Sequence, residues 1–283
     1  MEDRKQTLIF IISMLIFGTI GVFRRFIPLP SAFLAFSRGI LGGLFLLLLG
    51  KGRGEKIPRR SLAGLVVSGM LIGFNWMLLF EAYNYTTVAV ATLCYYMQPT
   101  IVVLLSPLIF GEKLTAKKAL CAAVAIAGMV LVSGVSEGSA GGSEGLKGIA
   151  FGLGAAVLYA SVIIMNKKIE GINPYRKTTV QLLSAGLVMV PYLLVSGGFS
   201  SLEFTPVSVV LLLIVGIFHT GMAYAMYFGS MEKLSVQSVA LLSYIDPVSA
   251  LFFSAFILGE PLSTAGVIGA VMIIGSAIVS ERR

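Results

Sequence analysis

Ten apolar runs, each close to the length that crosses a bilayer as a helix, follow one another along the 283 residues of this chain. About 20 helical residues span the hydrocarbon core, and a segment inside lipid must satisfy its own backbone hydrogen bonds. The alternating segments of about ten residues that mark a transmembrane barrel are absent. The pattern therefore predicts an all-α membrane protein with ten transmembrane helices. We place these spans near residues 7–25, 32–50, 61–82, 87–109, 116–134, 147–166, 177–196, 207–229, 234–257 and 264–280.

Composition supports a membrane protein and argues against several other classes. The chain is 57% hydrophobic and only 12% charged, whereas a soluble domain carries about 25% charged residues. Its net charge of +8 comes from short basic segments between the apolar runs, so we expect no nucleic-acid partner. Cys94 and Cys121 lie within apolar runs and offer neither a disulfide framework nor metal spacing, so we expect no metal and no cofactor. The first run lacks a small-residue cleavage site, so we interpret it as a retained helix.

The basic residues between the spans predict the orientation of the chain. The amino-terminal segment, every second loop after it and the carboxyl terminus together hold 17 Lys and Arg residues, whereas the opposite loops hold three. Basic loops stay in the cytoplasm. We therefore expect both termini in the cytoplasm and a multi-pass protein of the cell (inner or plasma) membrane, surrounded by lipid.

The chain also repeats itself at an offset of 148 residues. Residues 111–115 read GEKLT and residues 259–263 read GEPLS. Each copy contains five spans, which is an odd number, so the second copy must enter the membrane in the opposite orientation. The same offset pairs Tyr96 with Tyr244, Gln98 with Asp246 and Pro99 with Pro247.

This repeat predicts the organisation of the chain. We expect a first five-helix repeat over 1–135, an extracellular or periplasmic Gly/Ser-rich linker over 136–146 and a second, inverted repeat over 147–283. Inverted repeats are typical of transporters, which bind substrate near the bilayer midplane between the two copies. A duplicated helical scaffold without transport, as channels also show, is the alternative.

Two stretches, 79–134 and 226–280, resemble the signature half of the EamA type within the drug/metabolite transporter superfamily. Each has a small-residue helix start, a mid-helix proline and a Gly-Glu-x-Leu-Thr/Ser turn, and FLAFSRGILGG at 33–43 resembles the second helix of that family, with Arg38 at the position of a recurrent arginine. The resemblance implies ten helices around a central cavity, lined mainly by helices 1, 3, 4, 6, 8 and 9. It also implies export of amino acids, other small metabolites or drugs, although some members import.

Prolines interrupt the fourth and ninth spans at matching positions. Pro99 and Pro247 each lack a backbone donor and clash with the carbonyl four residues earlier, at Tyr95 and Ser243. In a membrane such interruptions are tolerated where they line a cavity or find partners on neighbouring helices. We therefore interpret both prolines as helix breaks at a substrate site, with a simple packing kink as the alternative.

Two titratable residues lie deep in the spans. Asp246 is one of only two aspartates in the chain, and an acid at this depth costs about 3 kcal/mol on insertion scales. We interpret it as a contact for a substrate amine or as a proton-coupling residue; a neutral carboxyl between helices is the alternative. His219, the only histidine, is the second proton-coupling candidate because its titration range suits a relay. An interhelical hydrogen bond is its alternative role.

Aromatic and amide side chains complete the predicted substrate site. Tyr and Trp combine an apolar face with a polar tip, which suits a cavity for small amphipathic molecules. Interfacial aromatic belts are the alternative. Tyr227 belongs to the same aromatic group. The predicted substrate-binding residues are Asn75, Trp76, Tyr95, Tyr96, Gln98, Tyr159, Asn166, His219, Tyr224, Tyr244 and Asp246.

Four further charged residues are predicted to lie toward the external end. Arg24, Arg25, Arg38 and Glu81 fall at or near span ends, and buried arginines need partners. We expect Glu81 to pair with one of these arginines in an outer gate. Snorkelling of the arginines to lipid headgroups is the alternative.

These observations favour a secondary transporter of small organic solutes, such as amino acids, related metabolites or drugs, and an exporter rather than an importer. No nucleotide-binding loop occurs, so a proton gradient or the substrate gradient would drive transport by alternating access around a midplane cavity. A passive channel or facilitator is the first alternative. An intramembrane enzyme is the second, although one membrane aspartate excludes an aspartyl dyad, so we expect no enzyme.

Overall fold

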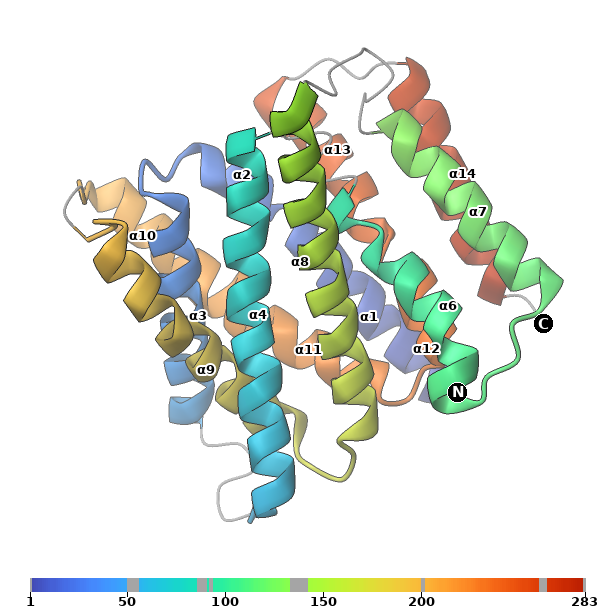
Figure 1. Ribbon diagram of the computed structural model, residues 1–283, viewed down its shortest axis with the longest axis horizontal. Helices are drawn as coiled ribbons and strands as arrows, with labels where there is room; N and C mark the ends of the chain where they lie inside the picture. The colour runs from blue at the N-terminus through green and yellow to red at the C-terminus, as the bar shows by residue number, and fades with distance from the viewer. Residues whose placement is uncertain are drawn as a thin grey trace.

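The chain folds into a bundle of helices in a computed structural model that describes residues 2–49, 56–85, 91, 94–132, 142–199, 202–259 and 264–281. All regular structure in these residues is helical, and the helices group into ten spans (Figure 1). In chain order they are α1 (Glu2–Gly18) with α2 (Ile20–Arg25); α3 (Ser31–Leu49); α4 (Arg59–Tyr85); α6 (Gln98–Phe110); α7 (Ala116–Val132); α8 (Gly142–Lys168); α9 (Pro174–Val195); α10 (Pro206–Ile214), η2 (Val215–Met222) and α11 (Ala223–Met231) as one; α12 (Val236–Leu242) with α13 (Ile245–Leu258); and α14 (Thr264–Glu281).

The predicted ten-helix, all-α fold is confirmed. By length and hydropathy, six of the described helices are long and apolar enough to cross a membrane, and two shorter apolar helices, Gln98–Phe110 and Thr264–Ser276, accompany them. The inverted insertion of the second repeat stays a prediction. Residues 142–146, expected in the linker, are the first residues of α8, and residues 133–141 lie outside the described part of the chain.

Most of the ten spans pack into two bodies, each built from both halves of the sequence. In the first body α3 and α4 of the first half pack against α8 and α9 of the second, and η2 packs on α3. In the second body α7 packs along α14, and α6 packs along α12. Figure 1 shows these bodies on opposite sides of the molecule, with α1 between them in contact with α11 and α13. The sequence halves are thus interleaved rather than packed as separate units.

Small residues allow the helices of the first body to approach closely. A Cβ atom added to Gly39 on α3 would lie 2.9 Å from the backbone oxygen of Leu182 on α9. One added to Gly73 on α4 would lie 2.8 Å from the backbone oxygen of Ala185. Membrane helices lack a hydrophobic drive toward each other, so such close contact is a main source of their packing energy. These contacts pack the helices of the first body tightly against each other.

The GEKLT motif ends one helix and begins the next. Gly111 follows α6 in the left-handed region, with φ of 67°, and Gly259 follows α13 in the same conformation, with φ of 69°. Glycine adopts this conformation without steric cost, and it commonly ends helices. The Thr115 hydroxyl then accepts a hydrogen bond of 3.3 Å from the Lys118 backbone N–H in the first turn of α7. Residues 260–263 of the second copy lie outside the described residues.

Candidate functional site

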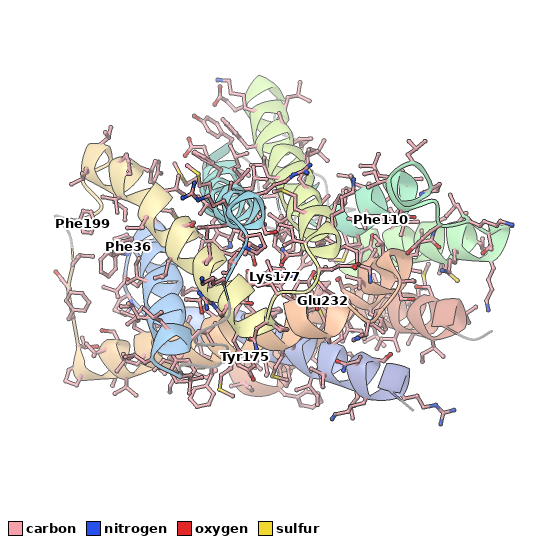
Figure 2. The ribbon with its side chains drawn as sticks, turned by 90° about the horizontal axis from the view of Figure 1, so that it is seen from below. Phe36, Phe110, Tyr175, Lys177, Phe199 and Glu232 are labelled. Atoms are coloured by element: carbon pink, nitrogen blue, oxygen red, sulfur yellow. The ribbon has the colours of Figure 1, made fainter. Side chains whose placement is uncertain are left out.

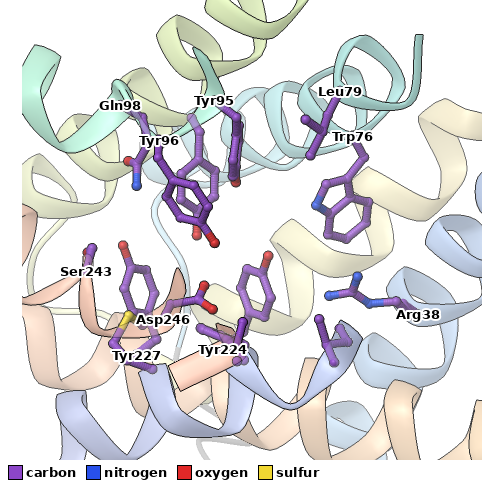
Figure 3. A pocket seen from close by; sticks show the side chains of 16 residues that line it. Arg38, Trp76, Leu79, Tyr95, Tyr96, Gln98, Tyr224, Tyr227, Ser243 and Asp246 are labelled. Atoms are coloured by element: carbon purple, nitrogen blue, oxygen red, sulfur yellow. The ribbon is translucent and has the colours of Figure 1, made fainter. Parts of the chain in front are cut away.

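A cavity of about 280 Å³ lies between the two bodies (Figure 3). Its wall takes residues from α1, α2, α3, α4, α6, α8, α11 and α13 and from the segments just before α6 and α13. A volume near 300 Å³ is at the lower end of the range for small-molecule sites. The lining residues are Met14, Phe17, Gly18, Ile20, Arg38, Trp76, Leu79, Tyr95, Tyr96, Gln98, Tyr159, Tyr224, Tyr227, Ser243, Asp246 and Ala250.

Both interrupted spans meet the cavity at their interruptions. The fourth span turns at residues 96–97 and continues as α6 from Gln98. The ninth ends its first helix at Leu242, turns at residues 243–244 and continues as α13. Each turn is closed by backbone hydrogen bonds between residues three positions apart, such as the one of 3.3 Å from the Asp246 N–H to the Ser243 carbonyl. The two breaks thus present side chains and helix starts to one space.

Asp246 occupies the first turn of α13. A helix start carries partial positive charge from its free N–H groups, which favours a carboxylate there. The Tyr96 hydroxyl donates a hydrogen bond to this carboxylate from the equivalent break in the other repeat. Asp246 keeps part of its surface accessible, and its carboxylate points into the cavity (Figure 3). The carboxylate is therefore positioned to receive a cationic or hydrogen-bond-donating group.

Arg38 faces Asp246 from the far end of the cavity. Its Nε donates a hydrogen bond of 3.0 Å to the Thr220 hydroxyl on η2, and its guanidinium lies 5.3 Å from the centre of the Trp76 ring. The salt bridges of the described residues, Lys147–Glu144 and Lys177–Glu232, do not include it. Figure 3 shows the Arg38 guanidinium and the Asp246 carboxylate pointing toward each other, with Tyr224 between them. The two charges leave room between them for a solute.

Aromatic rings form the apolar surface between these charges. Tyr95 and Tyr159 have ring centres 6.0 Å apart, and Phe17 contacts Tyr224 edge-on at 5.0 Å. Aromatic faces bind apolar groups and cations, and the phenol hydroxyls offer hydrogen bonds. The wall therefore suits a small solute that carries both charged groups and an apolar part.

Gln98 is the counterpart of Asp246 in the first repeat. Its side chain is 3% exposed, and its Oε1 has no hydrogen-bond partner among the described residues. An unsatisfied buried amide oxygen costs about 1–3 kcal/mol. A donor group on a bound solute would relieve this cost.

The structure brings together seven of the eleven predicted substrate-binding residues and places four elsewhere. The seven in the wall are Trp76, Tyr95, Tyr96, Gln98, Tyr159, Tyr224 and Asp246. Of the four others, Asn75 donates a hydrogen bond of 2.7 Å to the Ala155 carbonyl and so joins α4 to α8. Asn166 donates within α8 to the Val162 carbonyl.

The remaining two predicted residues join spans near the cavity. Tyr244 shares a hydrogen bond of 2.8 Å with Thr100, which connects the two interrupted spans to each other. His219 lies on the π-helix η2 and shares a hydrogen bond of 2.7 Å with Thr19, at the turn between α1 and α2. Both are buried and neither lines the cavity. These contacts match the interhelical alternative stated for His219.

The predicted outer gate is placed only in part. Arg38 lines the central cavity. The side chains of Arg24 and Arg25 lie outside the described part of the structure, so their pairing with Glu81 stays a prediction.

Among the described residues, no group of three or more His, Cys, Asp or Glu side chains could hold a metal ion.

The repeat offset contains a signal for lining residues that were not predicted from chemistry alone. Adding 148 to Leu79 gives Tyr227, and adding it to Tyr95 gives Ser243; all four line the cavity. Trp76 and Tyr224 are related in the same way. The site is thus pseudo-symmetric, and the offset from the predicted Tyr95 would have found Ser243. No sequence signal pointed to Met14, Phe17 or Thr220.

Known proteins resemble this chain along nearly its whole length. The EamA-like transporter family matches residues 4–134 and 146–281. The uncharacterized transporter YxxF of Bacillus subtilis (strain 168) is 30% identical over 96% of this chain and 88% of its own. Protein PecM of Dickeya dadantii (strain 3937) is 28% identical over 93% of this chain and 87% of its own.

A solved structure shares the fold. A crystal structure with 21% sequence identity superimposes with a TM-score of 0.85 and covers 97% of both chains. The double family match accounts for the 148-residue repeat, and the transporter names of the relatives agree with a cavity between two helical bodies. The chain belongs to the EamA-like transporter family.

Proposed function

We propose that this protein is a secondary transporter of small organic solutes that carry both a cationic and an anionic group, as amino acids and related metabolites do. The observation that supports this most directly is the separation of Arg38 and Asp246 across one cavity with aromatic walls (Figure 3). A solute amine would contact the Asp246 carboxylate, and a solute carboxylate would contact the Arg38 guanidinium. The apolar part would lie on Tyr224 and Trp76.

The electrostatics of the membrane interior favour such a solute. A lone charge is costly at this depth, so intramembrane acids and bases pair with each other or with a ligand. A zwitterion contributes one partner to each protein charge, and its own two charges cancel. A purely apolar solute would leave both protein charges without a partner, which gives the site a basis for selectivity.

Transport would follow from relative motion of the two bodies about the cavity. Body one supplies Arg38 and Trp76, and body two supplies Gln98 and Asp246, so the solute bridges them. The basic loops favour a cell-membrane protein with both termini in the cytoplasm, and the family resemblance favours export. Asp246 remains the first proton-coupling candidate. His219 is the second, through its bond to Thr19 rather than through the cavity.

Reconstitution of the whole chain into liposomes tests this proposal. Thermal unfolding of the purified protein with amino acids, amines, carboxylates and neutral analogues identifies a stabilising solute, because a ligand that binds only the folded state raises its stability. We expect zwitterions to stabilise more than matched amines or carboxylates. Counterflow of the labelled solute in liposomes should then saturate. Stabilisation by none of these classes, or flux that neither saturates nor shows counterflow, would contradict the proposal and favour a channel.

A further inference from the structure

We propose that Lys167, Lys177 and Glu232 form the inner gate of this transporter, an inward-turned cluster that holds the two bodies together at the lysine-rich end of the bundle. That end is the one to which the loop charges assign the cytoplasm. The inference rests on the proposed alternating access, because a gate has meaning only if the cavity opens at each end in turn. Its parts are the C-terminal end of α8, the first turn of α9 and the turn between α11 and α12.

Lys177 is a buried cation with a complete set of partners. It lies in the first turns of α9, is 0% exposed, and forms a salt bridge with the Glu232 carboxylate. Its Nζ also donates to the Ile169 carbonyl and, at 3.3 Å, to the Asn166 carbonyl at the end of α8. A buried ammonium is tolerated when its charge is paired and its protons are all bonded. Lys177 therefore joins three segments at one atom.

Lys167 makes a second connection of the same kind. Its Nζ donates to the carbonyls of Met231 at 3.1 Å, Glu232 at 3.0 Å and Leu234. The last carbonyls of a helix have no partner within the helix, and a cation at this end is stabilised by the helix dipole. Lys167 thus holds the end of α11 and the following turn against α8.

The inward direction of these lysines distinguishes them from their neighbours. Lysines at the ends of membrane helices commonly extend to the headgroups. Lys168, next to Lys167, does remain exposed. Figure 2, which views the molecule from below, shows Lys177 and Glu232 near the middle of the bundle rather than at its rim.

The cluster connects the two bodies. Lys167 and Lys177 stand on α8 and α9 in the first body, and the turn that they hold leads into α12 in the second. Glu112, in the loop between α6 and α7, accepts hydrogen bonds of 2.9 Å and 3.4 Å from the first N–H groups of α12, those of Val236 and Gln237. The turn links the span of η2 and α11, which packs on α3 and α9 of the first body, to α12 of the second. Glu112 holds the α12 end of this turn, and the lysines hold the turn against α8 and α9. Release of the lysines would let the bodies separate at this end.

Helix α11 connects this cluster to the cavity. Tyr227 lies in the cavity wall, and Met231, whose carbonyl binds Lys167, ends the helix one turn later. Four residues of helix span about 6 Å. Phe228 and Phe10 pack against Tyr227 and are fully buried, which leaves the helix little room to move independently. A solute that displaces Tyr227 would therefore act on the gate.

A distance measurement between the bodies tests the gate without any solute. Arg60 on α4 and Lys113 after α6 are exposed, and they lie in body one and in the loop of body two, respectively. After the buried Cys94 and Cys121 are replaced, Arg60→Cys and Lys113→Cys carry spin labels in liposomes. We expect one short distance with the native gate. A triple variant then removes the whole cluster: Lys167→Met, Lys177→Met and Glu232→Gln. It leaves no unpaired buried charge. We expect the fraction of molecules with a long distance between the labels to rise at least about tenfold over the native gate.

Lys233→Met is the matched control, because Lys233 is an exposed lysine of the same turn and its side chain is not part of the cluster. Lys168 is unsuitable, since its Nζ lies 6.0 Å from the Phe110 ring on α6. Lys233→Met should leave the distances unchanged. Lys167→Met alone keeps the Lys177–Glu232 pair and serves if the triple variant does not fold; we expect it to give a smaller increase of the same sign. A distance distribution for Lys167→Met that superimposes on that of Lys233→Met would overturn the gate. The proposed transport function is tested separately, by whether solute flux saturates and shows counterflow.

Discussion

The two interrupted spans share one backbone design and differ in the chemistry they bring to the cavity. Both turn for two residues, continue as a helix with a Gln-Pro or Asp-Pro pair in its first turn, and end that helix on a left-handed glycine. The first break presents Gln98, a neutral amide with an unpartnered oxygen. The second presents Asp246, an acid that accepts a hydrogen bond from Tyr96 of the first. Duplication therefore accounts for the shared backbone of the two breaks, and the difference between Gln98 and Asp246 gives only one of them an acid.

This difference teaches that the two breaks have separable roles. The prolines and the glycine ends would be needed wherever a broken helix lines a cavity, whatever the solute. The acid is needed only if something with a complementary charge or a proton binds there. Exchanging the chemistry of the breaks while leaving their backbones intact should therefore change selectivity more than folding.

The largest effect is expected at the charged break. Asp246→Asn keeps the shape of the side chain and removes its charge, so a solute amine loses a charge-assisted hydrogen bond. Such bonds contribute about 1.5–3 kcal/mol, which corresponds to roughly 10–100-fold in affinity. Titration of the purified variant with the zwitterion found by thermal screening measures the loss. The matched anionic analogue without the amine should lose far less, and an equal loss for both would show that Asp246 does not bind the amine.

Proton coupling at Asp246 has its own readout. If this acid carries the coupled proton, uptake driven by a pH gradient in liposomes should vanish in Asp246→Asn, while counterflow without a gradient persists. Persistent gradient-driven uptake would leave the role to His219, whereas a native protein without any such uptake would be driven by the substrate gradient. His219→Gln, which retains a hydrogen bond to Thr19, is the matched variant for that comparison.

A smaller effect is expected at the neutral break. Gln98→Leu keeps the approximate volume and removes the unpartnered oxygen, so a solute donor loses one neutral hydrogen bond of about 1 kcal/mol, or roughly fivefold in affinity. Without solute the variant should unfold at the same temperature or a higher one, because a buried unsatisfied group is removed. Gln98→Glu is the sharper comparison, since it gives both breaks an acid. It should shift preference from zwitterions toward solutes with two amines, and unchanged preference would contradict the assignment of charge selectivity to the breaks.

The ten spans, the two helix breaks and their correspondence could be predicted from the sequence. Span length, loop charge and proline position depend on local composition, and the 148-residue offset related the two breaks directly. The placement of Asn75 and Asn166 could not be predicted, because helical residues at similar depth face either a cavity or a neighbouring helix according to the packing of that helix. Arg38 shows the same limit: its position near a span end suggested a gate, whereas the approach of α3 to η2 places it in the cavity wall.

A further test concerns the cation that faces the charged break. Thr220→Val removes the hydroxyl that accepts from the Arg38 Nε, while the Arg38 charge remains. We expect the KM of zwitterionic and anionic solutes to rise about threefold, as for a partly lost hydrogen bond, with the maximal rate nearly unchanged. Thr220→Ser restores the hydroxyl and should restore the KM. A loss of the maximal rate in Thr220→Val that Thr220→Ser restores would instead indicate that the hydroxyl supports the π-helix through its bond to the Val215 carbonyl.

The smallest effect is expected where the two breaks touch. The Tyr244 hydroxyl and the Thr100 hydroxyl share a buried hydrogen bond of 2.8 Å that joins the start of α6 to the turn before α13. Hydrogen bonds between membrane helices average about 0.6 kcal/mol. Tyr244→Phe, Thr100→Val and the double variant form a cycle in which the free energy of unfolding should show a coupling of about that size. Because both residues lie outside the cavity wall, solute affinity should stay within about twofold of the native protein. A larger change in affinity would mean that the breaks move together when solute binds, and that their contact, as well as their chemistry, sets selectivity.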